Sequence, residues 1–394
     1  MNYILFDDAA WQDLRPLTYT RPVAEMRVGI LTISEKWKHS VKGSISHLTQ
    51  DYLQAKYPLV TSHTNMMING GLCPSPRLCE AISSLKKGQA LVTGELVLAA
   101  VVDAGDVSRI NELARTLSPV EYKGEFLKIR FPWDIFKNNG AAIESDYELL
   151  TRGRVSQPLG ETNRALGADR IFIEEGAVVQ FATLNASTGP IYIGKDAEVM
   201  EGSIVRGPFA LCDQSVLKMA CKIYGPTTIG PGSKVGGEIN NSVLWGNSNK
   251  AHDGFLGNSV LGEWCNLGAD TNNSNLKNNY EEVKLWSYTS GRFVKTGLQF
   301  CGLVMGDHSK CGINTMFNTG TVVGVSANIF GDGFPRNFIP SFAWGGAAGF
   351  QVYTLPKAFE VARKVLDRQG LQLSPVDEAI LTRVFEHDQQ WRNF

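Results

Sequence analysis

The stretch that decides the fold runs from residue 193 to residue 235 and reads IGKDAEVMEGSIVRGPFALCDQSVLKMACKIYGPTTIGPGSKV. Every sixth residue in it is aliphatic, in the series Ile193, Val199, Val205, Leu211, Leu217, Ile223, Ile229 and Val235. An α-helix repeats about every 3.6 residues and a lone strand every 2, so neither explains a period of six. This period is typical of a parallel β-helix, in which short strands wind around a prism and one aliphatic side chain per strand points inward.

The same spacing returns further along the chain. It separates Leu261 from Leu267, and it recurs in the series Met305, Cys311, Phe317, Val323 and Ile329. An antiparallel β domain would alternate every two residues and gives no reason for a step of six. We therefore predict a β-helix over residues 165–345. An Asn-rich insertion over about 270–298 interrupts it, either as a loop leaving the prism or as an arm across a neighbouring subunit.

The segments on either side of the predicted β-helix follow other patterns. Residues 1–155 combine short apolar strand candidates with three stretches of helical spacing, which predicts a mixed α/β domain. The helical stretches are Ile45–Lys56, Ser75–Lys86 and Gly105–Thr116. Residues 350–394 also have helical periodicity, and Pro375 after Ser374 predicts a helix start there. We expect these last helices to form a cap on the open end of the prism.

Composition excludes several classes of protein. The formal net charge is −1 and no basic run occurs, which argues against nucleic acid and anionic membrane surfaces. The sequence contains neither an apolar stretch of 18 residues nor a basic segment before its first apolar residues, so we expect no membrane helix and no signal peptide. The seven cysteines form no CxxC pair, which favours a reducing cytoplasm over a zinc site or a disulfide framework.

The strongest candidate for catalysis is His252, in the stretch NKAHDGFLG over residues 249–257. It lies between two regular hexad blocks with Gly254 and Gly257 nearby, so its ring can project from the coil surface. A neutral imidazole suits general-base catalysis near neutral pH. The alternative is an ordinary solvated histidine on a polar loop.

The stretch around His252 closely resembles a known family. Lys250-Ala251-His252, Phe255-Leu256-Gly257 and Asn266-Leu267-Gly268-Ala269 are similar to the acetyltransferase half of the bifunctional N-acetylglucosamine-1-phosphate uridylyltransferase/glucosamine-1-phosphate acetyltransferases. The resemblance implies a left-handed β-helix that works as a homotrimer with acetyl-CoA. It also implies that His252 is the general base and that Lys250, Phe255, Asn266 and Asn275 hold the sugar phosphate or acetyl-CoA. Phe255 and Leu276 stand where tyrosines are usual, and Asp270 where a glycine is usual, which leaves the sugar open.

The N-terminal stretch LRPLTYTRP, residues 14–22, is similar to the signature of sugar-1-phosphate nucleotidyltransferases. This resemblance implies a Rossmann-like α/β domain that binds a nucleoside triphosphate with Mg²⁺. The loop over residues 7–13 lacks the expected glycines, and Val23 replaces the expected lysine. The candidate nucleotide-binding residues are Arg15, Thr18, Arg21 and Arg27, because arginines bind phosphates bidentately. No metal site stands out among the available carboxylates Asp7, Asp8, Glu95 and Asp103.

Together these patterns predict a transferase of sugar-nucleotide biosynthesis. It would transfer an acetyl group from acetyl-CoA to a hexosamine 1-phosphate on the β-helix, and would join a nucleotide to a sugar 1-phosphate on the N-terminal domain. The alternatives are a sugar-1-phosphate nucleotidyltransferase only, or a catalytically decayed scaffold or regulatory homologue. A β-helix metalloenzyme like carbonic anhydrase would need three metal-binding histidines, but the coil holds only His252 and His308.

Overall fold

A computed structural model of the chain describes residues 1–113 and 116–394. The chain divides into two compact units. The first comprises residues 1–14, 20–26 and 31–131, and the second comprises residues 15–19, 27–30 and 132–394. Among the described residues, no helix has both the length and the apolar character needed to span a membrane.

The first unit is built on a mixed sheet. In the part of the chain that the structure describes, this sheet has the strand order β2-β1-β3-β6-β5-β7. Its strands are β1 (Asn2–Phe6), β2 (Ile45–Leu48), β3 (Thr64–Asn69), β5 (Gln89–Thr93), β6 (Leu96–Asp103) and β7 (Ser118–Glu121). β1 runs parallel to β2 and β3, whereas β6 is antiparallel to both β3 and β5. A small antiparallel pair joins β4 (Leu72–Cys73) to β8 (Leu127–Lys128).

Short helices lie between the strands of this sheet along the chain. Two of the three predicted helical stretches fall entirely within the described residues. The helices are α1 (Ala10–Asp13), η1 (Val23–Glu25), α2 (Ile33–Ser40), η2 (Asp51–Leu53), α3 (Pro76–Ser83), η3 (Ala104–Arg109) and α4 (Ile110–Leu113). The prediction over Ser75–Lys86 is confirmed by α3, which Ser75 caps by accepting the Leu78 N–H. The prediction over Ile45–Lys56 is wrong, because the segment pairs with β1 as the edge strand β2. The stretch Gly105–Thr116 contains η3 and α4, and residues 114–115 lie outside the described residues.

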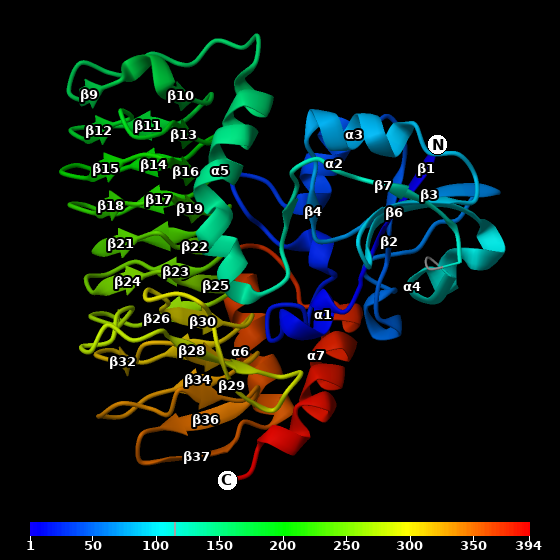
Figure 1. The fold of residues 1–394 in the computed structure, drawn as a ribbon. Helices are drawn as coiled ribbons and strands as arrows, with labels where there is room; N and C mark the ends of the chain where they lie inside the picture. Colours follow the sequence, from blue (N-terminus) through cyan, green and yellow to red (C-terminus); the bar gives the residue numbers. More distant parts are fainter. Residues whose placement is uncertain (114–115) are drawn as a thin grey trace. The chain divides into compact units, whose positions relative to one another are not determined.

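The second unit is a parallel β-solenoid with three faces, which confirms the predicted combination of an α/β domain, a β-helix and C-terminal helices. Figure 1 shows its strands stacked coil above coil. The first face consists of β10 (Ile171–Ile173), β13 (Ile191–Ile193), β16 (Phe209–Leu211), β19 (Thr227–Ile229), β22 (Val243–Gly246), β25 (Val260–Glu263), β30 (Leu303–Met305), β33 (Thr321–Val323) and β35 (Phe338–Ile339). The helix α5 (Pro132–Thr151) lies along this face and contacts β16, β19, β22 and β25.

The other two faces repeat the same parallel pairing. The second face consists of β11 (Val178–Val179), β14 (Glu198–Val199), β17 (Val216–Leu217), β20 (Lys234–Val235), β23 (Asn249–Lys250), β26 (Asn266–Leu267), β31 (Lys310–Cys311), β34 (Asn328–Ile329), β36 (Ala343–Gly346) and the antiparallel β37 (Gly349–Val352). The third face consists of β9 (Arg164–Leu166), β12 (Thr183–Asn185), β15 (Ile204–Arg206), β18 (Lys222–Tyr224), β21 (Glu238–Asn240) and β24 (Phe255–Gly257), followed by the pair β27 (Asn272–Asn273) and β32 (Met316–Phe317).

The aliphatic residues at every sixth position point into the prism. All eight belong to one buried core, from Ile193 and Leu217 at 0% exposed to Ile223 at 2%. Because this core holds the coils together, Leu217→Ala is expected to lower the free energy of unfolding by about 2–5 kcal/mol. The matched control is Met219→Ala, two residues further on and 67% exposed, which should change it by less than about 0.5 kcal/mol. Urea unfolding of both variants measures this, and equal effects would contradict an inward column.

The insertion folds back on its own chain. After β27 the chain forms the antiparallel hairpin of β28 (Lys284–Ser287) and β29 (Arg292–Lys295), and β28 contacts β33. The coil then resumes at β30. The chain ends with α6 (Leu355–Asp367), α7 (Pro375–His387) and η5 (Gln389–Trp391).

The C-terminal helices attach to the last coils. α7 begins at Pro375 with Ser374 as its N-cap, which confirms that predicted start. The buried Asp388 carboxylate, just after α7, accepts hydrogen bonds from the Tyr19 hydroxyl (2.6 Å) and from the Ser341 N–H (2.8 Å). α6 lies beside the second face, because its Ala358 and Ala362 line a small cavity together with Lys310.

Candidate functional site

The first unit contains a cavity of about 440 Å³ where β1 and β3 end. Asp7 and Asp8 directly follow β1, Asn69 ends β3, and Glu95 lies just before β6; all four line the cavity. In sheets of this kind, ligands bind at the carboxyl ends of the parallel strands. None of the described residues that line the cavity is a lysine or an arginine. The cavity therefore presents carboxylates and amides rather than cations.

The two adjacent carboxylates have different proton affinities. Burial raises the pKa of Asp7 to about 7, although the Thr49 hydroxyl (2.6 Å) and the Val23 N–H (2.9 Å) donate to its carboxylate. Burial also acts on Asp8, but the Lys128 ammonium at 3.1 Å and the amide N–H of Asn69 at 2.9 Å hold its pKa below the usual value. Near neutral pH, Asp8 is thus ionised while Asp7 is divided between its two forms.

The four predicted nucleotide-binding residues do not line this cavity. Thr18, Arg21 and Arg27 have buried side chains, and Arg15, Thr18 and Arg27 belong to the second compact unit. Arg27 donates to the carbonyl oxygens of Trp245 (3.1 Å from Nε) and Ile30, so it has a structural role. The Arg15 guanidinium lies over the ring of Tyr288, 5.6 Å from its centroid. The sequence patterns assigned no role to Asn69. Its position at the end of a buried strand is the feature of the sequence that could have identified it.

His252 lies in the four-residue turn that connects β23 to β24, at the corner between the second and third faces. Its side chain is exposed. The preceding coil has only Gly236 and Gly237 at the same corner. A Cβ at Gly237 would lie 2.7 Å from the Gly254 carbonyl oxygen, so this close approach of the two turns requires glycine. A two-residue corner reaches out less than a four-residue turn, which leaves His252 uncovered on that side.

Lys250 lies inside the prism rather than on its surface. It pairs in register with Val235 on the inward column and is 1% exposed. Its Nζ donates hydrogen bonds to the carbonyl oxygens of His252 (2.5 Å) and Asp253 (3.0 Å). Burial lowers the pKa of this ammonium to about 8. Lys250 thus holds the backbone of the turn that carries His252, and its predicted contact with substrate stays a prediction.

The remaining predicted binding residues lie on two faces. Phe255 begins β24 on the third face, and a Cβ at Gly257 would lie 2.5 Å from the tip of its ring and 2.7 Å from the Asn275 amide nitrogen. Phe255 and Asn275 therefore lie together beside Gly257, and the Asn275 amide donates to the Asn258 side-chain oxygen at 2.8 Å. Asn266 lies on the second face, in register with Asn249. Within one chain the structure therefore brings together two of these residues but not all of them.

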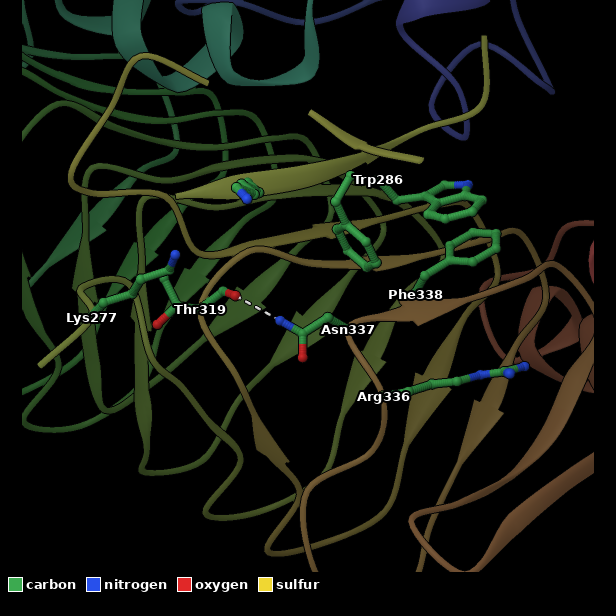
Figure 2. Close-up of a pocket in the computed structure, with 8 residues that line it drawn as sticks. Lys277, Trp286, Thr319, Arg336, Asn337 and Phe338 are labelled. Carbon is green, nitrogen blue, oxygen red and sulfur yellow. Dashed lines mark hydrogen bonds between the residues drawn. The ribbon is translucent and has the colours of Figure 1, made fainter. Parts of the chain in front are cut away.

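A second cavity, of about 580 Å³, lies under the β28–β29 hairpin, and Figure 2 shows its lining. The residues that line it are Lys277, Lys284, Trp286, Phe293, Thr319, Arg336, Asn337 and Phe338. They come from the insertion and from the segments that lead into the first face. His252 lies at a different corner, between the second and third faces. Sequence reasoning missed this cavity, although the insertion that forms it stood out as a break in the hexad spacing.

Comparison with known proteins finds similarity over parts of the chain. Residues 3–155 match the family model described as sugar nucleotidyl transferase. The chain is 28% identical over 213 residues to a bifunctional sugar-1-phosphate nucleotidylyltransferase/acetyltransferase from Sulfurisphaera tokodaii, covering 54% of this chain and 46% of the relative. It is 27% identical over 277 residues to the bifunctional protein GlmU of Methanococcus maripaludis, covering 68% of this chain and 60% of the relative. The chain thus spans about half to three fifths of the length of these relatives.

Solved structures match this chain at lower identity. A UDP-N-acetylglucosamine acyltransferase from Campylobacter jejuni aligns with 58% of this chain and 96% of its own, at 10% identity and a TM-score of 0.35. The sequence comparisons confirm the resemblance read from the two motifs and support a transferase. Residues 3–155 carry the sugar nucleotidyl transferase pattern, and the chain resembles the bifunctional nucleotidylyltransferase/acetyltransferases over about half its length.

Proposed function

We propose that the chain is a sugar-nucleotide enzyme whose solenoid transfers an acetyl group from acetyl-CoA to the amine of a hexosamine 1-phosphate. The observation that carries this proposal is the exposed imidazole of His252 on a turn whose backbone Lys250 holds from inside the prism. A base on a turn held in this way can accept a proton from a ligand bound at this corner of the solenoid. Phe255, Asn266 and Asn275 stay candidates for contacts with the sugar phosphate or acetyl-CoA.

The proposed step has a simple balance. The His252 imidazole takes a proton from the amine as its nitrogen attacks the carbonyl carbon of the thioester, and backbone N–H groups of the coil stabilise the oxyanion. The C–N bond forms and the C–S bond breaks, the imidazolium passes its proton to the leaving sulfur, and coenzyme A leaves as the thiol together with an N-acetylated sugar. From the resemblance to the bifunctional enzymes we expect a left-handed coil and a homotrimer, and from the cysteines without CxxC pairs we expect a cytoplasmic location.

Product analysis tests the proposed acetyl transfer. The protein would be incubated with acetyl-CoA and a panel of hexosamine 1-phosphates, and the mixture analysed by mass spectrometry. The proposal predicts an acetylated sugar phosphate for at least one member of the panel. If none is acetylated and acetyl-CoA shows no saturable binding, the solenoid is a scaffold rather than a catalyst.

A second activity, nucleotidyl transfer, is supported by the cavity at the ends of β1 and β3. Its described lining residues include Asp7, Asp8 and Glu95 but no cation, so a triphosphate would need a metal ion there to offset charge repulsion. Mg²⁺ is usually held by one or two carboxylates together with substrate phosphates. The ionised Asp8, with Glu95 in the same lining, fits that requirement, and the bound ion would neutralise charge on the phosphates.

Removing the Asp8 carboxylate tests this second activity. With a nucleoside triphosphate, Mg²⁺ and sugar 1-phosphates, Asp8→Asn should release pyrophosphate at least about 10²-fold more slowly than the wild type, because one electrostatic anchor is lost. Asp51→Asn, at an exposed position in the same unit, is the matched control. Equal rates for both variants and the wild type would remove Asp8 from the site.

A further inference from the structure

The cavity under the β28–β29 hairpin has an aromatic wall. The Trp286 indole stacks on the Phe338 ring, with centroids 4.2 Å apart, and Figure 2 shows the Phe338 ring lying against it. Trp391 from the C-terminal turn packs edge-on behind Trp286 at 5.4 Å, which stiffens the wall. Phe293 meets Trp286 edge-on at 5.3 Å and is 41% exposed. The wall therefore offers an accessible ring on which a planar ligand group can pack.

Three of the residues that line the cavity are cationic. Lys277, Lys284 and Arg336 line the cavity, and none of its described lining residues is acidic. In the part of the chain that the structure describes, the Lys284 ammonium makes no hydrogen bond or ion pair, while its backbone pairs with Lys295 in the hairpin. Among the described residues, the Lys277 ammonium donates only to the backbone carbonyl of Glu282, at 3.1 Å. The Arg336 guanidinium lies against the rings of Phe350 and Phe394, 5.3 and 5.2 Å from their centroids. The cavity thus carries positive charge that no carboxylate in its described lining offsets.

Polar groups on the opposite side are also arranged for a ligand. The Asn337 amide donates to the Thr319 carbonyl oxygen at 2.9 Å, which fixes the orientation of the side chain (Figure 2). The cavity volume of about 580 Å³ lies in the range of sites that enclose small molecules. An aromatic surface beside two lysines suits a ligand that joins a planar ring to an anion.

We infer that this cavity binds a nucleoside diphosphate group, with its base packed on Phe293 and its phosphates against Lys277 and Lys284. Two kinds of molecule carry this group: coenzyme A thioesters, and nucleotide-activated sugars. The inference concerns binding at the hairpin, so it stands or falls independently of acetyl transfer at His252. It gives the insertion a function that the regular coils cannot supply, since they lack a projecting aromatic hairpin.

Isothermal titration calorimetry with the full chain tests this site. The titrations would be run without divalent cations, because their absence disfavours nucleotide binding at the carboxylate-lined cavity of the first unit. They would compare UDP, ADP, uridine, pyrophosphate, coenzyme A and UDP-N-acetylglucosamine. The inference predicts saturable binding of a nucleoside diphosphate, at least about 10-fold tighter than of the nucleoside or of pyrophosphate alone. Tighter binding of coenzyme A or of the nucleotide sugar then identifies which source the site accepts.

Variants locate the binding. Lys277→Ala and Lys284→Ala should each weaken it about 10-fold, because each removes a charge-assisted contact. Phe293→Ala should weaken the binding of nucleoside diphosphates but not the binding of pyrophosphate. Lys295→Ala is the matched control: it lies opposite Lys284 on the same hairpin and pairs with Glu282 at 3.6 Å, outside the cavity lining. The inference is overturned by the absence of saturable binding, by pyrophosphate binding as tightly as the diphosphates, or by an equal loss in Lys295→Ala.

Discussion

The His252→Ala variant is expected to transfer acetyl groups about 10²–10⁴-fold more slowly than the wild type, which is the usual contribution of a general base. The loss should appear in kcat with little change in KM, because an exposed imidazole on a turn adds to proton transfer more than to ground-state binding. Release of the coenzyme A thiol, followed with a thiol reagent over a range of hexosamine 1-phosphate concentrations, measures both constants.

His308 provides a closely matched control for this variant. It also lies at a corner of the solenoid, and its carbonyl oxygen accepts a hydrogen bond from the Lys310 ammonium at 2.9 Å, as that of His252 does from Lys250. The ring of His308 instead stacks on Trp264, with centroids 6.4 Å apart. His308→Ala should therefore keep kcat near the wild-type value. A His252→Ala enzyme as active as His308→Ala would exclude His252 as the base.

Replacing Lys250 by methionine is expected to change stability in a pH-dependent way. Burial lowers the pKa of Lys250 in the folded chain to about 8, whereas an unfolded lysine titrates near 10.4. Between these values the unfolded chain binds more protons at this position, so the stability of the wild type rises with pH there relative to the variant. The stability of Lys250→Met relative to the wild type should thus be highest at pH 7 and should fall by about 3 kcal/mol by pH 11.

Unfolding in urea at several pH values, with wild type and variant side by side, measures this difference. The comparison removes the contributions of other titrating groups, since both proteins contain them. Lys234→Met is the matched control, because Lys234 lies on the same face of the solenoid with an exposed side chain. A stability difference for Lys250→Met that stays constant from pH 7 to pH 11 would contradict the depressed pKa. Since the ammonium also holds the turn of His252, the same variant should slow acetyl transfer.

The period of six predicted the solenoid because it is a local property of the chain. Each coil pairs in register with the next, so the inward position is set by sequence spacing alone, as at Leu211 and Ile229. The helix predicted over Ile45–Lys56 failed for the opposite reason. Its apolar spacing suits a short helix as well as an edge strand followed by a turn, and only the pairing of β2 with β1 decides between them.

The role of Lys250 was within reach of the sequence. It lies six residues after Leu244 and six before Leu256, which places it on the inward column that the hexad spacing defines. The family resemblance pointed instead to a contact with substrate. Arg27 could not be placed in this way, because its partner Trp245 is 218 residues away in the sequence. The aromatic wall of the hairpin likewise depends on Trp391, which meets Trp286 only in the folded chain.

Acetyl transfer on the solenoid requires that wild-type protein release the coenzyme A thiol from acetyl-CoA only when an amino sugar phosphate is present, and a thiol reagent measures this release. We predict saturable release with at least one hexosamine 1-phosphate and none without it. Thiol release that is absent with every amino sugar phosphate, or that proceeds equally without any acceptor, would contradict acetyl transfer on the solenoid.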